Sequence, residues 1–170
     1  MGTPTRDDVW LCLHLYEQRR EPVLREAREW MSNFCPASFK DIRSVVDGSA
    51  GVDANRFWRQ ATSYWEMIAA LFNSGGISPE GRELFAQTTR EWFLFWSKIA
   101  PFIDELRAEF RPSAFGNLEL FCRSQPDYDV QLAYFTKMNA GIRMRSAKAA
   151  KAGKAVKGKA PRRAQAKQRR

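Results

Sequence analysis

The chain has 170 residues, of which 28 are basic and 19 are acidic, and its formal net charge is +9. Residues 143–170 hold 12 Lys or Arg and no Asp or Glu, so residues 1–142 keep 16 basic residues against 19 acidic ones. The longest uncharged stretch has 13 residues, whereas a membrane-spanning helix needs about 20, and the N-terminus lacks the pattern of a secretory signal. We therefore expect a cytoplasmic protein in which the tail, and not the body, attracts polyanions.

Cysteine and histidine usage argues against several kinds of chemistry. Cys12, Cys35 and Cys122 are an odd number without short spacing, and His14 is the sole histidine. A disulfide framework or zinc knuckle is therefore not indicated, and a zinc or di-iron centre has few ligands available. We predict no metal, no cofactor and no catalytic residue, and we favour a non-enzymatic protein.

The N-terminal third of the chain predicts three helices. The first is expected over residues 7–18, with Thr5 as its N-cap. A second helix begins at Pro22, because proline is tolerated in the first turn. Ser38 is expected to cap a short third helix that runs through Val45.

The middle of the chain predicts longer helices with clear boundaries. Asp53 is expected to cap a long helix that ends at residues 73–76, where glycine can adopt the left-handed C-terminal conformation. Ser78 is expected to cap a new helix that starts at Pro79, breaks near residues 88–89 and resumes. Pro101 should kink the resumed helix or mark a join between two helices.

The last part of the body predicts a short helix around Phe121 and a final amphipathic helix. The final helix begins near Tyr128, carries Ile142 on its apolar face, and is expected to close early at Gly141. Two-residue alternation is missing throughout, so no strand is predicted. The sequence predicts an all-α fold, a single bundle of five to seven helices.

The domain organisation follows from the change in composition near residue 142. Residues 1–142 form the helical domain. Residues 143–170 are expected to be a disordered polycationic tail, because they have too few apolar side chains to offset the entropy lost on ordering.

Five large apolar residues stand in a row in the middle of the chain. At about 100° per residue they surround a whole helical turn, so no face of that turn is polar. A central helix packed on all sides would explain this, as would an exposed partner or dimer surface or an apolar ligand pocket. The candidate partner surface consists of Trp92, Phe93, Phe95 and Trp96.

A polar cluster is expected where the long middle helix meets the first two helices. Glu66 follows Trp65 in an apolar stretch, and a buried carboxylate must be paired. It is either part of a functional site or a structural ion pair between the first and third helical segments. The candidate cluster contains Arg19, Arg20, Tyr64 and Glu66, with Arg25 and Arg28 as alternative partners.

Three segments carry a likeness to a known family. They are LHLYEQRREPVLREAREW at 13–30, SYWEMIAALFNSGGIS at 63–78 and FWSKIAPFIDELRAEF at 95–110. In this order they resemble a family of small, mostly bacterial helical proteins known only as a domain of unknown function, over residues 9–123. The resemblance implies a soluble or membrane-adjacent helical domain and brings no activity, cofactor or catalytic residue.

The tail resembles, in composition alone, the lysine- and alanine-rich tails of linker histones and of some bacterial chromosome-associated proteins. It would bind phosphates by counterion release with little sequence preference, and it has no aromatic residue for stacking on bases. Anionic membrane, an acidic protein, or a merely solubilising role are the alternatives. The candidate polyanion-binding residues are Arg143, Arg145, Lys148, Lys151, Lys154, Lys157, Lys159, Arg162, Arg163, Lys167, Arg169 and Arg170.

Two functions follow as hypotheses. In the first, the tail tethers a non-enzymatic helical binding protein to nucleic acid or another polyanion. In the second, the body is a protein-interaction or scaffold module, homodimeric through the aromatic helix, and the tail is dispensable.

Overall fold

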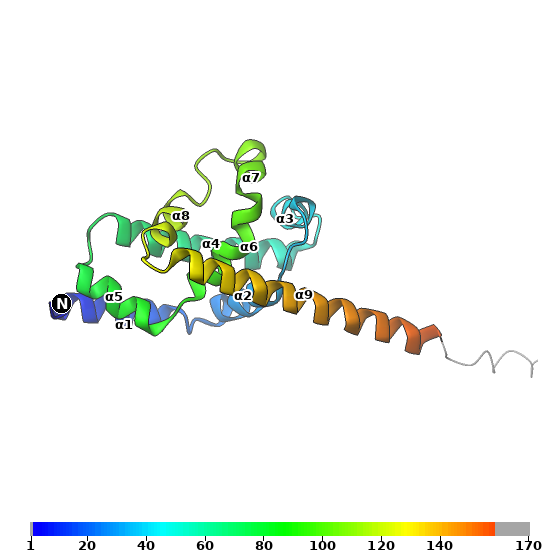
Figure 1. The fold of residues 1–170 in the computed structure, drawn as a ribbon, viewed down its shortest axis with the longest axis horizontal. Coiled ribbons are helices and arrows are strands. Elements are labelled where there is room, and N and C mark those ends of the chain that lie inside the picture. Colours follow the sequence, from blue (N-terminus) through cyan, green and yellow to red (C-terminus); the bar gives the residue numbers. More distant parts are fainter. Residues whose placement is uncertain (1, 159–170) are drawn as a thin grey trace, which may run out of the picture.

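The structure, a computed structural model, describes the backbone of residues 2–158 and the side chains of residues 2–149. This part of the chain contains helices and no strands, so the predicted all-α bundle is confirmed (Figure 1). The helices outnumber the five to seven expected, partly because the segment around Pro101 is divided into three short elements. In chain order they are α1 (Arg6–Gln18), α2 (Pro22–Asn33), α3 (Phe39–Val46), α4 (Val52–Asn73), α5 (Pro79–Thr88), α6 (Glu91–Ile99), the 3₁₀ helix η1 (Ala100–Phe102), α7 (Ile103–Glu109), α8 (Gly116–Arg123) and α9 (Tyr128–Gly158).

Most of the predicted helix starts are confirmed. Thr5 caps α1 and Ser38 caps α3, each in a reciprocal capping box, and Ser78 caps α5 ahead of its first-turn proline. The prediction that Asp53 caps α4 is wrong, because the N-cap is Gly51 with φ of 110°. That backbone conformation is open to glycine and strained for other residues, so Asp53 falls inside the first turn.

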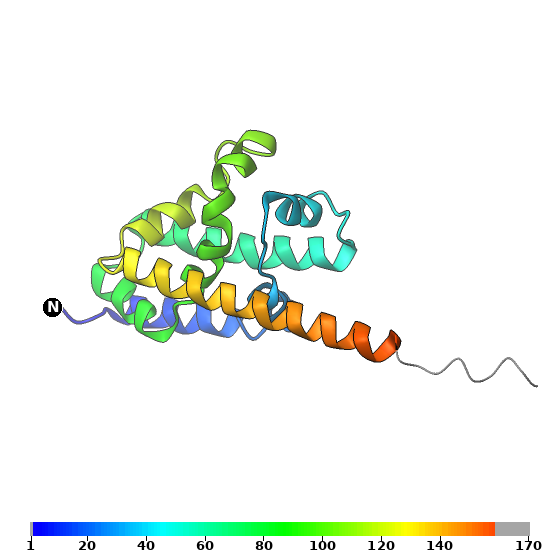
Figure 2. The same cartoon turned by 45° about the vertical axis from the view of Figure 1, so that its right-hand side comes forward.

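The arrangement of the helices places α4 and α6 at the centre. α4 packs against α2 and α8, while α6 packs against α9 and α8, and α1 pairs with α5 at one end (Figures 1 and 2). Aromatic contacts join these layers; the Trp65 ring of α4, for example, meets Trp92 and Phe95 of α6 at centroid distances of 6.0 Å. The core is therefore one continuous cluster.

The aromatic run lies in α6, and all of its side chains are buried. Among the predicted explanations, the central helix packed on all sides is confirmed. Trp92, Phe93, Phe95 and Trp96, the candidate partner or dimer surface, are each at most 1% exposed, so in this fold their side chains lie in the core and not at the surface.

The last helix does not end where its sequence predicts. α9 passes Gly141 and continues to Gly158, and its final turns project from the body (Figures 1 and 2). A glycine inside a helix costs about 1 kcal/mol relative to alanine. Contacts to α6, such as the 2.8 Å bond that Asn139 Nδ2 donates to Ser97 Oγ, offset that cost. The predicted domain boundary at 142–143 therefore falls within α9.

The remaining part of the predicted tail, residues 159–170, lies outside the described residues. It includes Lys159, Arg162, Arg163, Lys167, Arg169 and Arg170.

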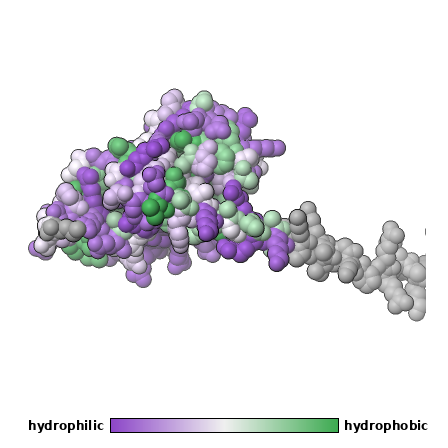
Figure 3. All heavy atoms as spheres, in the orientation of Figure 1, coloured by the Kyte–Doolittle hydropathy of each residue, from purple (hydrophilic) through white to green (hydrophobic). Residues whose placement is uncertain are grey.

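Hydrophilic residues cover most of the face seen in Figure 3, and hydrophobic ones appear there as small separate patches. Within the described residues, every helix is too short or too polar to cross a membrane.

Candidate functional site

Four arginines, two from the turn between α1 and α2 and two from α2, line one small cavity of about 180 Å³. The chain turns sharply after Gln18, and α2 begins at Pro22, which brings the end of α1 against the first turns of α2. Arg25 and Arg28 lie three positions apart and so share a face of α2. The arginine pocket consists of Tyr16, Arg19, Arg20, Arg25 and Arg28.

One carboxylate, Glu91 at the start of α6, holds two of these arginines in place. Its Oε2 accepts a bond from Arg19 Nη2 at 2.9 Å and another from Arg28 Nε at 2.8 Å. Arg28 Nη1 also donates to the Arg19 carbonyl oxygen at 3.2 Å. The Arg19 and Glu91 side chains are only 11% and 12% exposed, so these ion pairs are firmly positioned.

The other guanidinium groups of the pocket have unused hydrogen-bonding capacity. Arg19 Nε is buried and has no hydrogen-bond partner among the described residues. Arg20 and Arg25 are exposed, and neither forms an ion pair within residues 2–149. The arrangement therefore presents donors and positive charge to an anion.

The predicted cluster of Arg19, Arg20, Tyr64 and Glu66 is only partly assembled. Tyr64 is buried and donates from its hydroxyl to the Leu15 carbonyl at 2.7 Å, and burial raises the pKa of its phenol. Glu66 does not pair with any of these arginines. Residues two apart on a helix point about 200° away from each other, so Tyr64 and Glu66 face opposite sides of α4.

Glu66 instead caps the N-terminus of α8. Its carboxylate accepts bonds from the backbone N–H of Asn117 at 3.0 Å, from the Asn117 amide at 3.0 Å and from the Leu118 N–H at 2.9 Å. The acid that clamps the arginines is Glu91, which sequence reasoning missed. The signal was present, because Glu91 opens a helix whose next five residues are large and apolar, and a carboxylate drawn into such a core needs a partner.

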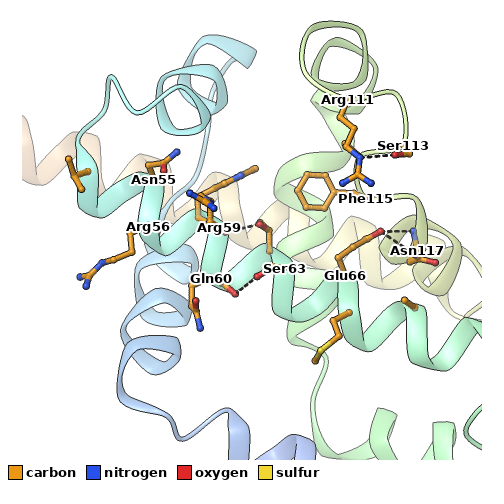
Figure 4. A pocket seen from close by; sticks show the side chains of 16 residues that line it. Asn55, Arg56, Arg59, Gln60, Ser63, Glu66, Arg111, Ser113, Phe115 and Asn117 are labelled. Carbon is orange, nitrogen blue, oxygen red and sulfur yellow. Dashed lines mark hydrogen bonds between the residues drawn. The ribbon is translucent and has the colours of Figure 1, made fainter.

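A wider groove of about 990 Å³ runs along the outer face of α4 toward the loop before α8 (Figure 4). Phe115 lies over this face, in a left-handed conformation with φ of 55°. Arg111 Nε donates to Ser113 Oγ at 2.9 Å. The Glu66 carboxylate, at the far end of the groove, already accepts a bond from the backbone N–H of Asn117 in α8. The groove thus has aromatic and arginine side chains but no free carboxylate to act as an acid or base.

A lysine that the sequence did not single out lies at the other end of the bundle. Lys98 of α6 is buried, and its Nζ donates to the carbonyl oxygens of Met31, Ser32 and Phe34 at 2.7, 2.8 and 2.8 Å. These three bonds use all the N–H groups of the ammonium and cap the C-terminal end of α2. Cys35 Sγ lies 3.6 Å from the same nitrogen, beside a cavity of about 580 Å³.

The described side chains contain no group of three or more His, Cys, Asp or Glu that could hold a metal ion. His14 is exposed; its ring stacks on Trp10 at 5.3 Å and contacts the Gln18 amide at 3.1 Å.

The basic residues of the projecting helix are a further feature of functional interest. Arg143, Arg145 and Lys148 are exposed on α9, and Arg143 donates to the Pro36 carbonyl at 2.8 Å. Lys151, Lys154 and Lys157 follow on the helical backbone, and their side chains lie outside the described residues.

Comparison with known proteins identifies one family. Neither a curated protein nor a solved structure matches the chain. The model of the family described as Domain of unknown function (DUF4760) matches residues 5–124, which include α1 to α8 and the whole arginine pocket. The chain therefore belongs to this family of unknown function, in agreement with the resemblance found over residues 9–123.

Proposed function

We propose that this protein is a non-enzymatic helical binding protein that the basic part of α9 and the following residues tether to nucleic acid without sequence specificity. One observation carries the proposal. α9 leaves the body as an exposed helix, and from residue 143 onward the chain has basic residues and no acidic ones.

The spacing of the basic residues suits a polyanion that surrounds a helix. Lysines at 148, 151, 154 and 157 recur every three positions, so each is turned about 60° from the one before. Four lysines at this spacing would span about half the circumference of a helix instead of forming one stripe. The major groove of duplex DNA admits an α-helix and presents phosphates on both sides, which would relieve the repulsion between these like charges.

The body contributes little to this attraction, because residues 1–142 carry an excess of acidic residues. Binding through the tail would release counterions from the phosphates. If about 8–10 charges engage duplex DNA, the slope of log K against log salt concentration is expected to be about −7 to −9.

The test uses the full chain and a variant in which Lys148, Lys151, Lys154 and Lys157 are replaced by Gln. Fluorescence anisotropy with two duplexes of unrelated sequence, over a salt titration, measures affinity and slope. We expect similar binding to both duplexes by the parent protein. In the variant the slope should become less negative by about 3–4, close to one unit for each phosphate that the missing lysines no longer neutralise.

A control variant loses the same charge from the body through Lys40→Gln, Arg59→Gln, Arg111→Gln and Lys137→Gln. Its salt slope should stay near that of the parent protein. Equal losses in both variants, or a clear preference for one duplex, would contradict a tail-borne, non-specific tether.

A further inference from the structure

We propose that the arginine pocket is a binding site for a phosphate group, carried by a small solute or by a lipid headgroup. The pocket lies between α1 and α2, inside the matched family domain, whereas the proposed nucleic-acid tether begins at residue 143 of α9. The inference therefore concerns a second site and does not depend on the function proposed above.

The charge balance of the pocket favours a ligand with two negative charges. Four guanidinium groups line the cavity, and the Glu91 carboxylate is bonded to two of them, those of Arg19 and Arg28. Like charges held around a small concavity repel each other, and an anion placed among them removes that repulsion. One carboxylate offsets only one of the four charges, so a phosphate dianion matches the remainder better than a monovalent carboxylate does.

Two of the four arginines are held in place and can position a phosphate group, and the other two are free to move toward it. Arg19 and Arg28 are held by the same Glu91 oxygen, at 2.9 and 2.8 Å, so their guanidinium planes are fixed before a ligand arrives. Arg20 and Arg25 are exposed and free to close on it. The guanidinium group matches phosphate oxygens with paired N–H bonds, and the buried Arg19 Nε still lacks an acceptor among the described residues.

The size of the cavity restricts the ligand. Its volume is about 180 Å³, well below the roughly 300–1,000 Å³ of pockets that hold drug-sized molecules. A phosphate group with a small substituent fits this space, whereas a nucleotide base would have to remain outside.

The surface beside the pocket bears on the source of the phosphate. Tyr16 joins the pocket to the outer face of α1, where Trp10 and Leu13 are 66% and 59% exposed. Exposed Trp and Leu side chains next to arginines are the features of a helix that rests on an anionic membrane surface. The experiment therefore needs a solute arm and a lipid arm.

The solute arm measures binding of inorganic phosphate to the full chain by calorimetry, with chloride adjusted to hold the ionic strength constant. The pocket variant is Arg20→Gln with Arg25→Gln, which leaves the Glu91 ion pairs intact. The control is Arg6→Gln with Arg59→Gln, two exposed arginines elsewhere. We expect saturable binding that falls about tenfold or more in the pocket variant and is unchanged in the control.

The lipid arm measures co-sedimentation with phosphatidylcholine vesicles that contain a minor fraction of phosphatidic acid. If the pocket variant loses binding of inorganic phosphate, the ligand is a small phosphorylated solute. If it loses binding of the vesicles alone, the ligand is a lipid headgroup. If the pocket and control variants behave alike in both arms, or if acetate binds as well as phosphate, the inference is overturned. Duplex DNA binding by the pocket variant should match the parent protein, which keeps this test separate from the nucleic-acid tether.

Discussion

At the scale of single residues, Asp8 determines how α1 and α5 meet. Its carboxylate is buried and accepts bonds from the Ser78 hydroxyl at 2.6 Å, the Ser78 N–H at 3.0 Å, the Thr5 hydroxyl at 2.7 Å and the Thr5 N–H at 2.9 Å. These bonds, those from Ser78 above all, hold the pKa of Asp8 well below its usual range. One side chain thus completes the caps of two helices.

The close approach of α1 and α5 leads to a prediction for Gly81. A Cβ atom there would lie 2.6 Å from Asp8 Cγ and 2.7 Å from Ile77 Cγ1. We expect Gly81→Ala to lower the free energy of unfolding by about 1–3 kcal/mol, the usual cost of overpacking, as measured by urea denaturation. The matched control is Gly116→Ala in the first turn of α8, where nothing lies within 4 Å of the added methyl group. A control as destabilised as Gly81→Ala would show that space is not the cause.

Lys98 makes stability depend on pH in the alkaline range. Burial lowers the pKa of Lys98 from 10.5 to about 8 in the folded protein. Between these two values the unfolded chain binds more protons, so the free energy of unfolding rises with pH. Below pH 8 the contribution of Lys98 is constant.

Between the folded and unfolded pKa values of Lys98, we expect this residue to raise the free energy of unfolding by up to about 1.4 kcal/mol per pH unit. Burial raises the pKa values of the Cys122 thiol and the Tyr64 phenol, which lowers stability above about pH 9. The measurement is therefore the difference in slope between the parent protein and Lys98→Met from pH 8 to 9. Identical slopes would mean that Lys98 titrates normally in the fold.

At the scale of elements, two helix ends are satisfied by side chains from distant helices. Glu66 of α4 accepts the first free N–H groups of α8, and Lys98 of α6 donates to the last carbonyl groups of α2. The opposite charges suit the partial charges of the two termini. Each contact orients a short helix against a central one.

Removing the Glu66 cap should loosen α8 locally. We expect Glu66→Ala to cost about 0.5–2 kcal/mol, in the range measured for the removal of N-caps, and to speed hydrogen exchange at the amides of Asn117 and Leu118. Glu105→Ala, at an exposed position of α7, should change neither quantity. Unchanged exchange at Leu118 in the first variant would contradict a capping role.

At the scale of the whole molecule, a compact body carries one helix that runs beyond it. The side chains of residues 143–149 are exposed, whereas Asn139 is still buried against α6. We infer that the body holds α9 through its first half. The first half of α9 should therefore contribute to the stability of the body, and the residues after it should contribute to polyanion binding.

We expect a chain that ends at residue 149 to keep its melting temperature within about 2 °C of the full chain, a change below 1 kcal/mol at this size. Calorimetry at matched ionic strength measures it. A drop comparable with that of Gly81→Ala would show that residues 150–170 contribute to the stability of the body.

The sequence by itself determined the features that depend on neighbouring residues. Three N-caps and the break at Pro101 follow from contacts within a turn or two, so they could be read without a fold. The apolar content of the 92–96 run fitted a central helix, a partner surface and a ligand pocket, and the packing of the other helices decided its burial. Only the tertiary structure decided which charges meet. Arg19 and Glu91 are 72 positions apart and Lys98 and Met31 are 67 apart, and such pairs depend on how helices pack. At Gly141 the local preference is to end the helix, but α9 continues because its packing against α6 outweighs that preference.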